Sequence, residues 1–367
     1  MGCDRPNRIK HSDAINIQIE KAAVLKAKPD PHNLGFGKHF TDHMFVAKYS
    51  LDKQWHDLKI IPFQDLKLTP TACVLHYGQA LFEGLKAYRR NDGHVGLFRP
   101  EFNWMRMKQG SDRLCMQAPP KEIFLEAVEQ LVRLDQDWIP ETPNSSLYIR
   151  PTLIATEGFL GIRPSNEYLF FIVLSPVGPY YPEGLAPTKI WIEKEFVRAA
   201  PGGLGSTKAA ANYAGSLKAS ENAKAKGFTQ VLWLDVHKKY IEEVGTMNVF
   251  FVFDNEIVTP GLEGTILGGK IRDTAIQLLR AKGHKVQERK LSLAELTQAH
   301  QDGRLKEVFG TGTAAVISPV GTLASDDFNI TINQGKSGEV SESLHKELTD
   351  IQYGRVSDSQ SWNVIVD

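Results

Sequence analysis

The sequence has few cysteines, no excess of charge of either sign and no long apolar run. Its three cysteines, Cys3, Cys73 and Cys115, are too few and too far apart for a disulfide framework or a paired metal-ligand motif, so we expect no metal site and favour a reducing compartment. Forty-three basic residues balance 43 acidic ones, which argues against a nucleic-acid binder or a polybasic membrane binder. No stretch approaches the roughly 18 uninterrupted apolar residues of a membrane span.

The first residues also lack the features of a targeting segment. The run Met1-Gly2-Cys3-Asp4 has no apolar signal core, and Pro6 stands where a myristoylation pattern has Ser or Thr. Together with the sparse cysteines, this start predicts a cytoplasmic protein. Internal repeats and low-complexity tracts are absent from the sequence as well.

The length of 367 residues predicts two domains rather than a single small core. Residues 1–33 are polar and predict an N-terminal arm, and residues 178–187 are rich in proline and glycine and predict a linker. We therefore predict an α+β protein with a smaller N-terminal α/β domain over residues 1–177. A larger C-terminal domain is predicted over residues 188–367.

Turn and cap residues divide the chain into expected elements. Strands are expected at residues 42–50, 57–62, 146–154, 168–175, 229–235 and 307–309. Hairpins are expected at 85–98, turning on Asn91-Asp92-Gly93, and at 247–259, turning on Asp254-Asn255. Helices are expected from Pro100 to about Leu114, after Pro120, and at about 209–226, 270–281 and 339–352. Ser292 and Glu295 form a capping-box pattern that predicts another helix.

Lys208 is the first candidate for a chemical role. It is the one charged side chain within residues 202–213, and its small neighbours let the backbone pack closely around the amine. A buried amine without a nearby carboxylate favours the neutral form, which is the nucleophile in Schiff-base formation. The alternative is a surface lysine after a flexible glycine loop. The segment lacks the Gly-Lys-Ser/Thr order of a phosphate loop, so a nucleoside-triphosphate site of that kind is set aside.

A carboxylate and two glycine-rich segments could complete a cofactor site. Glu243 comes just before Val-Gly-Thr and an apolar run, where it could keep a pyridine nitrogen protonated; alternatively it is a glutamate in a turn at a strand edge. Residues 267–272 lead into a predicted helix and residues 310–315 end a predicted strand, and both could bind a phosphate. Arg99 could add a cation to that phosphate or could simply begin a surface helix.

Taken in order, these segments resemble the branched-chain amino acid aminotransferases, which are fold-type IV pyridoxal-phosphate enzymes. The resemblance extends from about Phe36 to Gly354, and its motifs lie at residues 36–44, 76–77, 81–88, 97–100, 147–151, 212–213, 243–248 and 310–314. It implies reversible amino transfer between leucine, isoleucine or valine and 2-oxoglutarate, giving the branched-chain 2-oxo acid and glutamate. It also implies pyridoxal 5′-phosphate as the cofactor, bound between two domains, and a homodimer.

The resemblance assigns a role to each candidate residue. Lys208 would form the Schiff base and carry the proton between the substrate Cα and the cofactor C4′, Tyr213 would bind the phenolic oxygen, and Glu243 would bind the pyridine nitrogen. The phosphate would be held by Arg99, Thr246, Gly269, Lys270, Ile271 and Thr313. The substrate would meet Phe36, Tyr77, Phe82, Tyr148, Ala314 and Ala315. Of these, Ala314 and Ala315 would take its carboxylate with help from Tyr77, and a second subunit would contribute Tyr148.

Two other interpretations are carried forward. An enzyme of the same fold could act on D-amino acids or as an aminodeoxychorismate lyase, although the aromatic set Phe36, Tyr77 and Tyr148 speaks against a lyase. A non-catalytic homologue would have lost Lys208, Tyr213 or Glu243, and all three are present. Some family members carry a Cys-x-x-Cys pair after the Gly-Thr-Ala turn. Ala315 and Ser318 stand at those positions here, so no thiol switch is expected there.

Overall fold

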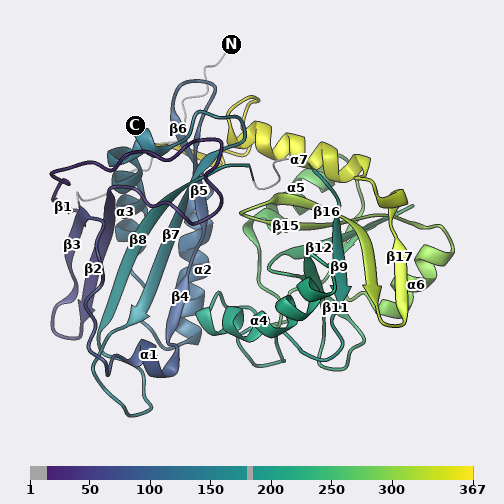
Figure 1. The fold of residues 1–367 in the computed structure, drawn as a ribbon, viewed down its shortest axis with the longest axis horizontal. Coiled ribbons are helices and arrows are strands. Elements are labelled where there is room, and N and C mark those ends of the chain that lie inside the picture. The colour runs from purple at the N-terminus through teal and green to yellow at the C-terminus, as the bar shows by residue number, and fades with distance from the viewer. Residues whose placement is uncertain (1–14, 180–184, 367) are drawn as a thin grey trace. The chain divides into compact units, whose positions relative to one another are not determined.

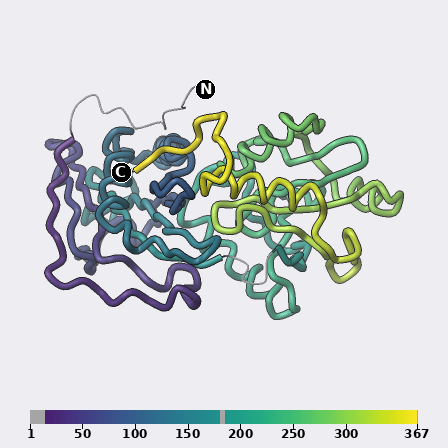
Figure 2. The backbone as a smooth tube through the Cα atoms, turned by 90° about the horizontal axis from the view of Figure 1, so that it is seen from above, coloured from purple at the N-terminus to yellow at the C-terminus, as the bar shows by residue number. Residues whose placement is uncertain are grey.

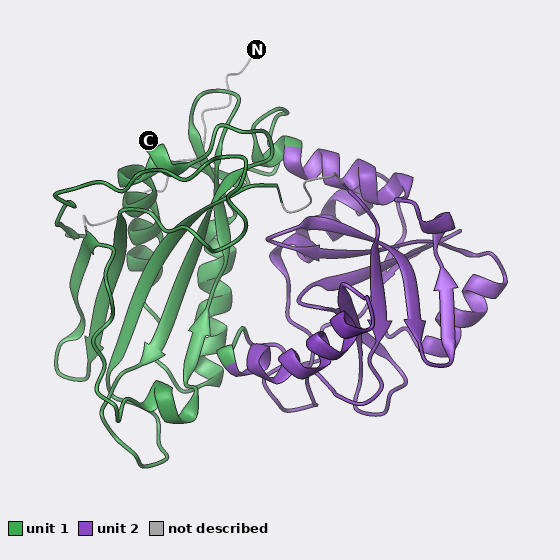
Figure 3. Cartoon of the chain, viewed as in Figure 1, with its two compact units in different colours: residues 1–180, 208–210, 350–367 green, residues 181–207, 211–349 purple. Residues whose placement is uncertain are grey.

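The computed structural model describes residues 15–179 and 185–366, which form two compact units (Figure 3). Unit 1 comprises residues 1–180, 208–210 and 350–367, and unit 2 comprises residues 181–207 and 211–349. Residues 180–184 of the predicted linker and residues 1–14 of the predicted arm lie outside the described residues. The backbone passes directly from unit 2 to unit 1 at Lys208 and returns after Ala210.

The elements alternate between strands and helices along the chain (Figure 1). The strands are β1 (Gln18–Ile19), β2 (His43–Ser50), β3 (Gln54–Pro62), β4 (Ala80–Phe82), β5 (Leu85–Arg89), β6 (Val95–Phe98), β7 (Ser146–Ala155), β8 (Tyr168–Val177), β9 (Thr188–Ile192), β10 (Gln230–Leu234), β11 (Ile241–Val244), β12 (Asn248–Phe253), β13 (Ile257–Thr259), β14 (Val286–Glu288), β15 (Leu305–Gly312), β16 (Val316–Ser325), β17 (Phe328–Thr331) and β18 (Asn363–Ile365). The α-helices are α1 (Cys73–Tyr77), α2 (Pro100–Arg113), α3 (Lys121–Leu134), α4 (Ala210–Ala225), α5 (Lys270–Ala281), α6 (Leu293–Gln301) and α7 (Glu339–Gln352).

Unit 1 is built on a sheet with the strand order β1-β3-β2-β8-β7-β5-β6-β18, to which β4 adds by pairing with β7. Its long strands are antiparallel, with β7 and β8 paired over ten residues. Helix α3 packs on β2 and β8 through Phe124, whose ring stacks on Phe170 at 5.8 Å. The α3 face follows from sequence, since Ile123, Ala127 and Leu131 recur at helical spacing and all three are buried.

Unit 2 is built on a second sheet with the order β11-β10-β9-β16-β15-β12-β13-β14, and β17 pairs with β16. The apolar core of this sheet is formed largely by its strands, and Leu296 and Ala299 of α6 pack into it. The predicted hairpin is confirmed, because β12 and β13 pair antiparallel across Asp254-Asn255. Helix α5 ends before Gly283, which adopts φ 85° as its predicted role at a helix end requires.

The C-terminal residues differ from the predicted division at residues 177 and 188. The last strand, β18, pairs antiparallel with β6 of the unit 1 sheet, with Asn363 opposite Phe98. Figure 2 traces this final backbone segment in yellow beyond α7. Unit 1 therefore contains the larger part of the chain, which reverses the predicted order of size. A strand of three residues gave too short a pattern for its partner to be identified from sequence.

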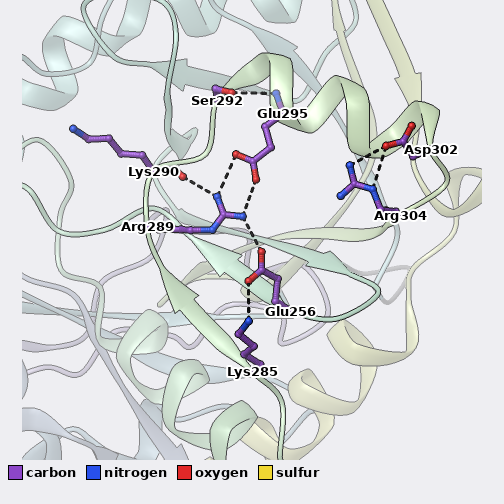
Figure 4. A network of polar contacts seen from close by, with 8 residues as sticks. All are labelled: Glu256, Lys285, Arg289, Lys290, Ser292, Glu295, Asp302 and Arg304. Carbon is purple, nitrogen blue, oxygen red and sulfur yellow. Dashed lines mark hydrogen bonds and ion pairs between the residues drawn. The ribbon is translucent and has the colours of Figure 1, made fainter.

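The start of α6 matches the predicted capping box in one of its two bonds (Figure 4). Ser292 Oγ accepts the Glu295 N–H at 3.0 Å. The Glu295 carboxylate, however, binds Arg289 at 2.7 Å, and Arg289 also binds Glu256 at 2.8 Å. The guanidinium has therefore replaced the Ser292 N–H as the partner of Glu295. Such partly exposed ion pairs contribute about 0–1 kcal/mol each, so this network orients the loop more than it stabilises the unit.

Within the described ranges, no helix combines the length and apolar character needed to cross a membrane. The same residues contain no cluster of three or more His, Cys, Asp or Glu side chains suited to a metal ion. Cys73 and Cys115 are both free thiols.

Candidate active site

One face of the unit 1 sheet collects polar and aromatic side chains. Directly paired residues of antiparallel strands point to the same face, and the pairs Phe82–Thr152, Lys86–Tyr148 and Tyr148–Ser175 therefore share one face. Phe170 points to the opposite face, toward α3, because residues alternate along β8. Period-two alternation thus places Phe82, Lys86, Tyr148, Arg150 and Ser175 together on the sheet face turned away from α3.

Arg150 organises the aromatic residues of this face. Its guanidinium lies 4.5 Å from the centre of the Phe82 ring and donates to the Tyr148 hydroxyl oxygen at 2.9 and 3.2 Å. Phe36 approaches Tyr148 edge to face at 4.9 Å between ring centres. Phe36, Phe82 and Tyr148, three of the predicted substrate residues, are therefore gathered around one cation. Tyr148 makes these contacts within its own chain, which argues against the expectation that a second subunit contributes it.

Gly84 provides the space in which the Tyr148 hydroxyl lies. A Cβ at this position would lie 2.3 Å from Tyr148 Oη. We expect Gly84→Ala to lower the free energy of unfolding by about 1–3 kcal/mol, as overpacking does, and to displace Tyr148. Chemical denaturation measures this loss, with Gly215→Ala as the control. Gly215 lies in α4, and a Cβ added there would have nothing within 4 Å, so alanine should be neutral or stabilising by up to about 1 kcal/mol. Equal stability of Gly84→Ala and the native chain would contradict the packing argument.

Lys208 joins this group through its backbone and its amine. Its carbonyl accepts the Phe82 N–H at 3.3 Å, and its Nζ lies 4.8 Å from the centre of the Phe82 ring. Burial lowers the pKa of the Lys208 amine to about 8; the Arg106 cation acts in the same direction and the Glu83 carboxylate in the opposite one. At neutral pH the amine is therefore much closer to its nucleophilic form than an exposed lysine is.

The charges next to Lys208 come from α2 and from Glu83, which lies between β4 and β5. Glu83 is fully buried and accepts hydrogen bonds from Arg106 Nε and Nη2, both at 2.7 Å, and from Asn103 Nδ2 at 2.7 Å. Burial raises the pKa of the Glu83 carboxyl, but Arg106 outweighs burial and, with Lys208 and Asn103, holds this pKa below its usual value. Glu83 therefore stays ionised, and Arg106 keeps positive charge close to Lys208.

A second group of predicted residues lies in unit 2 around Glu243 of β11. Glu243 is 4% exposed, and its Oε1 accepts the Leu267 N–H at 2.8 Å. Its Oε2 lies 3.3 Å from Arg198 Nε, and Arg198 also donates to the carbonyls of Gly205 and Thr265. This carboxylate is therefore held in one orientation by a backbone N–H and a buried cation.

The loop before α5 is fixed from the same strand region. Asn248 Nδ2 donates to the Leu267 carbonyl at 2.8 Å, so Glu243 and Asn248 together hold both backbone polar groups of Leu267. A Cβ at Gly269 would lie 2.1 Å from Asn248 Oδ1, which explains the glycine. Gly269 is the N-cap of α5 and provides no side-chain cap. The first turn of α5, with the buried Lys270 and Ile271, has the geometry that favours an anion at a helix start.

The Gly-Thr-Gly-Thr segment ends β15 and turns into β16. Gly310 and Gly312 lie against Met247, since a Cβ on either would come within 3.0 Å of that side chain. Thr313 and Ala314 are half-buried and Ala315 is buried. Thr311 Oγ1 is buried without a hydrogen-bond partner, although sequence reasoning selected Thr313 instead.

Arg99 adopts the left-handed conformation at the start of α2, with φ 48° and ψ 54°. Such a backbone costs of order 1–3 kcal/mol in a non-glycine residue and is frequent at functional sites. The guanidinium lies 5.1 Å from the Phe102 ring centre and 5.4 Å from that of Trp362. The residue is thus held in place by neighbours on two sides.

The remaining predicted residues occupy more exposed positions. Tyr213 lies on the first turns of α4 and is half-buried, and Thr246 is exposed in the turn between β11 and β12. Tyr77 is 43% exposed, and its hydroxyl donates to the Leu160 carbonyl rather than to a member of the Phe36–Phe82–Tyr148 group.

Within each unit the predicted residues thus form a separate group. Lys208, Arg99, Phe36, Phe82 and Tyr148 belong to unit 1, whereas Tyr213, Glu243, Thr246, Gly269 and Thr313 belong to unit 2. Sequence reasoning gave no role to Arg106, Arg150 or Arg198, the guanidinium groups that neighbour Lys208, Tyr148 and Glu243. The Tyr-Ile-Arg-Pro motif contains Arg150, and its alternation with Tyr148 along one strand was a signal for that residue.

The donor set fits pyridoxal 5′-phosphate in chemical type. It contains an amine with a lowered pKa, a buried carboxylate and a helix N-terminus that has no side-chain cap. A Schiff-base partner, a pyridinium partner and a phosphate site are the three requirements of that cofactor.

Comparisons with known proteins agree with these features. Residues 80–323 match the family model described as amino-transferase class IV. The chain is 54% identical to branched-chain-amino-acid aminotransferase 2 of Bacillus subtilis (strain 168), over 95% of this chain and 97% of that protein. It is 50% identical to a probable branched-chain-amino-acid aminotransferase of Staphylococcus aureus (strain N315), over 95% and 98% respectively.

A solved structure shows the same fold. The branched-chain amino acid aminotransferase of Escherichia coli superimposes with a TM-score of 0.74 at 25% identity, covering 89% of this chain and 99% of that one. The same TM-score of 0.74 is reached, at 26% identity, by a thermophilic-type relative, the T.th. branched-chain amino acid aminotransferase solved with pyridoxamine 5′-phosphate, covering 88% and 98%.

Proposed function

The chain belongs to the class IV aminotransferases and is a branched-chain-amino-acid aminotransferase, and we propose that it performs this reaction with pyridoxal 5′-phosphate held on Lys208. The observation that carries the assignment of Lys208 is its amine, which packs over Phe82 with a pKa lowered to about 8. The amino group would pass from leucine, isoleucine or valine to 2-oxoglutarate, giving the branched-chain 2-oxo acid and glutamate.

The bound cofactor would supply an electron sink for the bond that breaks at the substrate Cα. The Lys208 amine would accept the proton from that carbon and return it to the cofactor C4′, a role that its lowered pKa favours. Glu243 would stay ionised opposite the pyridine nitrogen because the Arg198 guanidinium lies 3.3 Å from it. Tyr213 would bind the phenolic oxygen.

The phosphate would be held by the first turn of α5 and by cationic and hydroxyl side chains. The residues are those expected from the resemblance, namely Arg99, Thr246, Gly269, Lys270, Ile271 and Thr313. The left-handed backbone of Arg99 supports its place in this group, since that strain is otherwise unexplained.

The substrate side chain would lie among the aromatic rings of unit 1. Phe36, Phe82 and Tyr148 surround an uncharged surface beside Arg150, and the backbone of Ala314 and Ala315 would take the α-carboxylate with Tyr77. An apolar pocket of this kind separates aliphatic side chains by only about 1–3 kcal/mol per methylene, so we expect all three branched-chain amino acids to react.

Steady-state assays with each L-amino acid and 2-oxoglutarate test the substrate proposal. Production of glutamate from leucine, isoleucine and valine, with little from D-leucine, supports it. Turnover of D-amino acids alone, or lyase release of pyruvate from aminodeoxychorismate, would transfer the chain to the other branches of the fold. A homodimer and a cytoplasmic location are proposed from the family resemblance and the sparse cysteines respectively.

The lowered pKa of Lys208 gives a prediction on pH. The neutral amine is the nucleophile, and its fraction rises as pH increases through about 8 rather than through the ordinary lysine value of 10.5. The rate at which apoenzyme takes up pyridoxal 5′-phosphate, followed by visible absorption, should therefore approach its plateau between about pH 7 and 9. Lys86 is the matched control, because burial lowers its pKa to about 8 as well. Lys86→Met should keep the profile, and a midpoint near 10 in the native chain would contradict the assignment.

A further inference from the structure

Unit 2 contains a cavity of about 250 Å³ that includes none of the proposed cofactor or substrate residues. Its volume equals that of about eight water molecules at ~30 Å³ each, so a small organic molecule fits. Apolar walls alternate with charged groups around it. The lining residues that carry the argument are Asp235, Ile241, Glu242, Glu263, Ile266 and Lys290.

Glu242 is the unusual member of this lining. It follows Ile241 on β11 and precedes Glu243, so its side chain points to the strand face opposite that of Glu243. It is only 6% exposed, and its Oε2 has no hydrogen-bond partner. A buried carboxylate oxygen without a donor is costly, of order 1–3 kcal/mol or more, and such groups are uncommon in folded proteins.

The other charged groups of the cavity are already engaged. Asp235 Oδ1 accepts the N–H groups of Lys239 and Tyr240 at 2.7 and 2.9 Å. Glu263 pairs with Lys290 at 2.8 Å. The lining therefore has an excess of carboxylates, and Glu242 is the carboxylate that lacks a donor on one oxygen.

We infer that this cavity is a binding site for a small organic ammonium ion, which donates an N–H to Glu242 and packs its alkyl groups on Ile241 and Ile266. The ion would reach the carboxylate after a small rotation about the last torsion of Glu242, which is a soft one. Burial raises the pKa of Glu242, and Asp235 raises it further against the opposing effects of Thr265 and Arg198. A bound cation would offset both of the raising causes.

Calorimetric titration of the holoenzyme with trimethylammonium chloride tests the site. This ion has one N–H donor and cannot form a Schiff base, so it does not react at Lys208. Tetramethylammonium has the same charge and no N–H. We expect trimethylammonium to bind at least about tenfold more tightly than tetramethylammonium, as one hydrogen bond to a charged group requires.

Two variants and one control locate the binding. Glu242→Gln should weaken trimethylammonium binding by about tenfold or more, and Val236→Trp should block the cavity because Val236 lines it and is 37% exposed. Glu221→Gln changes an exposed carboxylate of α4 and should leave binding unchanged. Undiminished binding in folded Val236→Trp, or no detectable binding to the native chain, would overturn the inference. Because neither readout involves amino transfer, its failure leaves the proposed function untouched.

Discussion

Replacing Lys208 by alanine is expected to lower kcat for amino transfer from leucine by at least about 10²–10⁴-fold, the usual contribution of a positioned proton carrier. The nearby amine of Lys86 cannot take its place at Phe82, since Lys86 is fixed on the neighbouring strand opposite Tyr148. The variant should still bind pyridoxal 5′-phosphate through Glu243 and the start of α5. That bound cofactor should lack the visible absorption band of a Schiff-base link to the protein.

Two measurements make this result specific to the amine. Borohydride reduction followed by peptide mass analysis should label Lys208 in the native chain and no other lysine. Lys218→Ala serves as the control, because Lys218 is exposed on α4 and its loss should leave kcat within a factor of about two. Full activity in Lys208→Ala, or a label on another lysine, would move the catalytic role away from this position.

The second large effect concerns stability. Arg106→Met leaves the fully buried Glu83 without its bidentate partner, and breaking such a pair costs about 3–5 kcal/mol. Lys108→Met breaks the exposed pair with Asp112 on the same helix and should cost at most about 0.5 kcal/mol. Urea unfolding of both variants measures the difference. A double variant, Glu83→Gln with Arg106→Met, should recover most of the loss because no buried charge is left.

The Glu83 contribution has a defined dependence on pH. Its pKa in the folded chain is below the ordinary value of 4.5, so the folded form retains a proton less readily than the unfolded form. The stabilisation is fully present above the unfolded pKa and disappears as pH falls through the folded pKa. Native chain and Arg106→Met should therefore converge in stability in acid below about pH 4. Parallel curves down to about pH 2 would show that the pair acts through packing rather than charge.

Local signals predicted most elements of the fold because those elements carry their own punctuation. The hairpin of β5 and β6 turns at Gly93 with φ 86°, and α2 begins at Pro100 as its sequence indicates. Strand β16 was missed, since Pro319 and Gly321 interrupt its pattern. It is nonetheless a central strand, because β9, β15 and β17 supply its hydrogen bonds from distant parts of the chain. Tertiary pairing of this kind overrides local propensity.

The candidate site divides in the same way. Lys208 and Glu243 were recognisable because each stands alone among small or apolar neighbours, which is a local property of the sequence. Their guanidinium neighbours were not recognisable. Arg106 is about a hundred residues from Lys208 along the chain, and Arg198 approaches Glu243 only through the fold. Charge partners of buried groups are set by packing, which residue spacing does not encode.

The pairing of β18 with β6 has a consequence for how the protein is made. The edge of β6 acquires its last partner only when residues 363–365 have left the ribosome, although β6 itself ends at Phe98. At roughly 5–20 residues per second, that interval is on the order of tens of seconds. During it, the nascent chain exposes an unpaired strand edge, which is the kind of surface that chaperones cover and that pairs with other chains. Synthesis rate and chaperone supply should therefore affect the yield of this protein more than its final stability does.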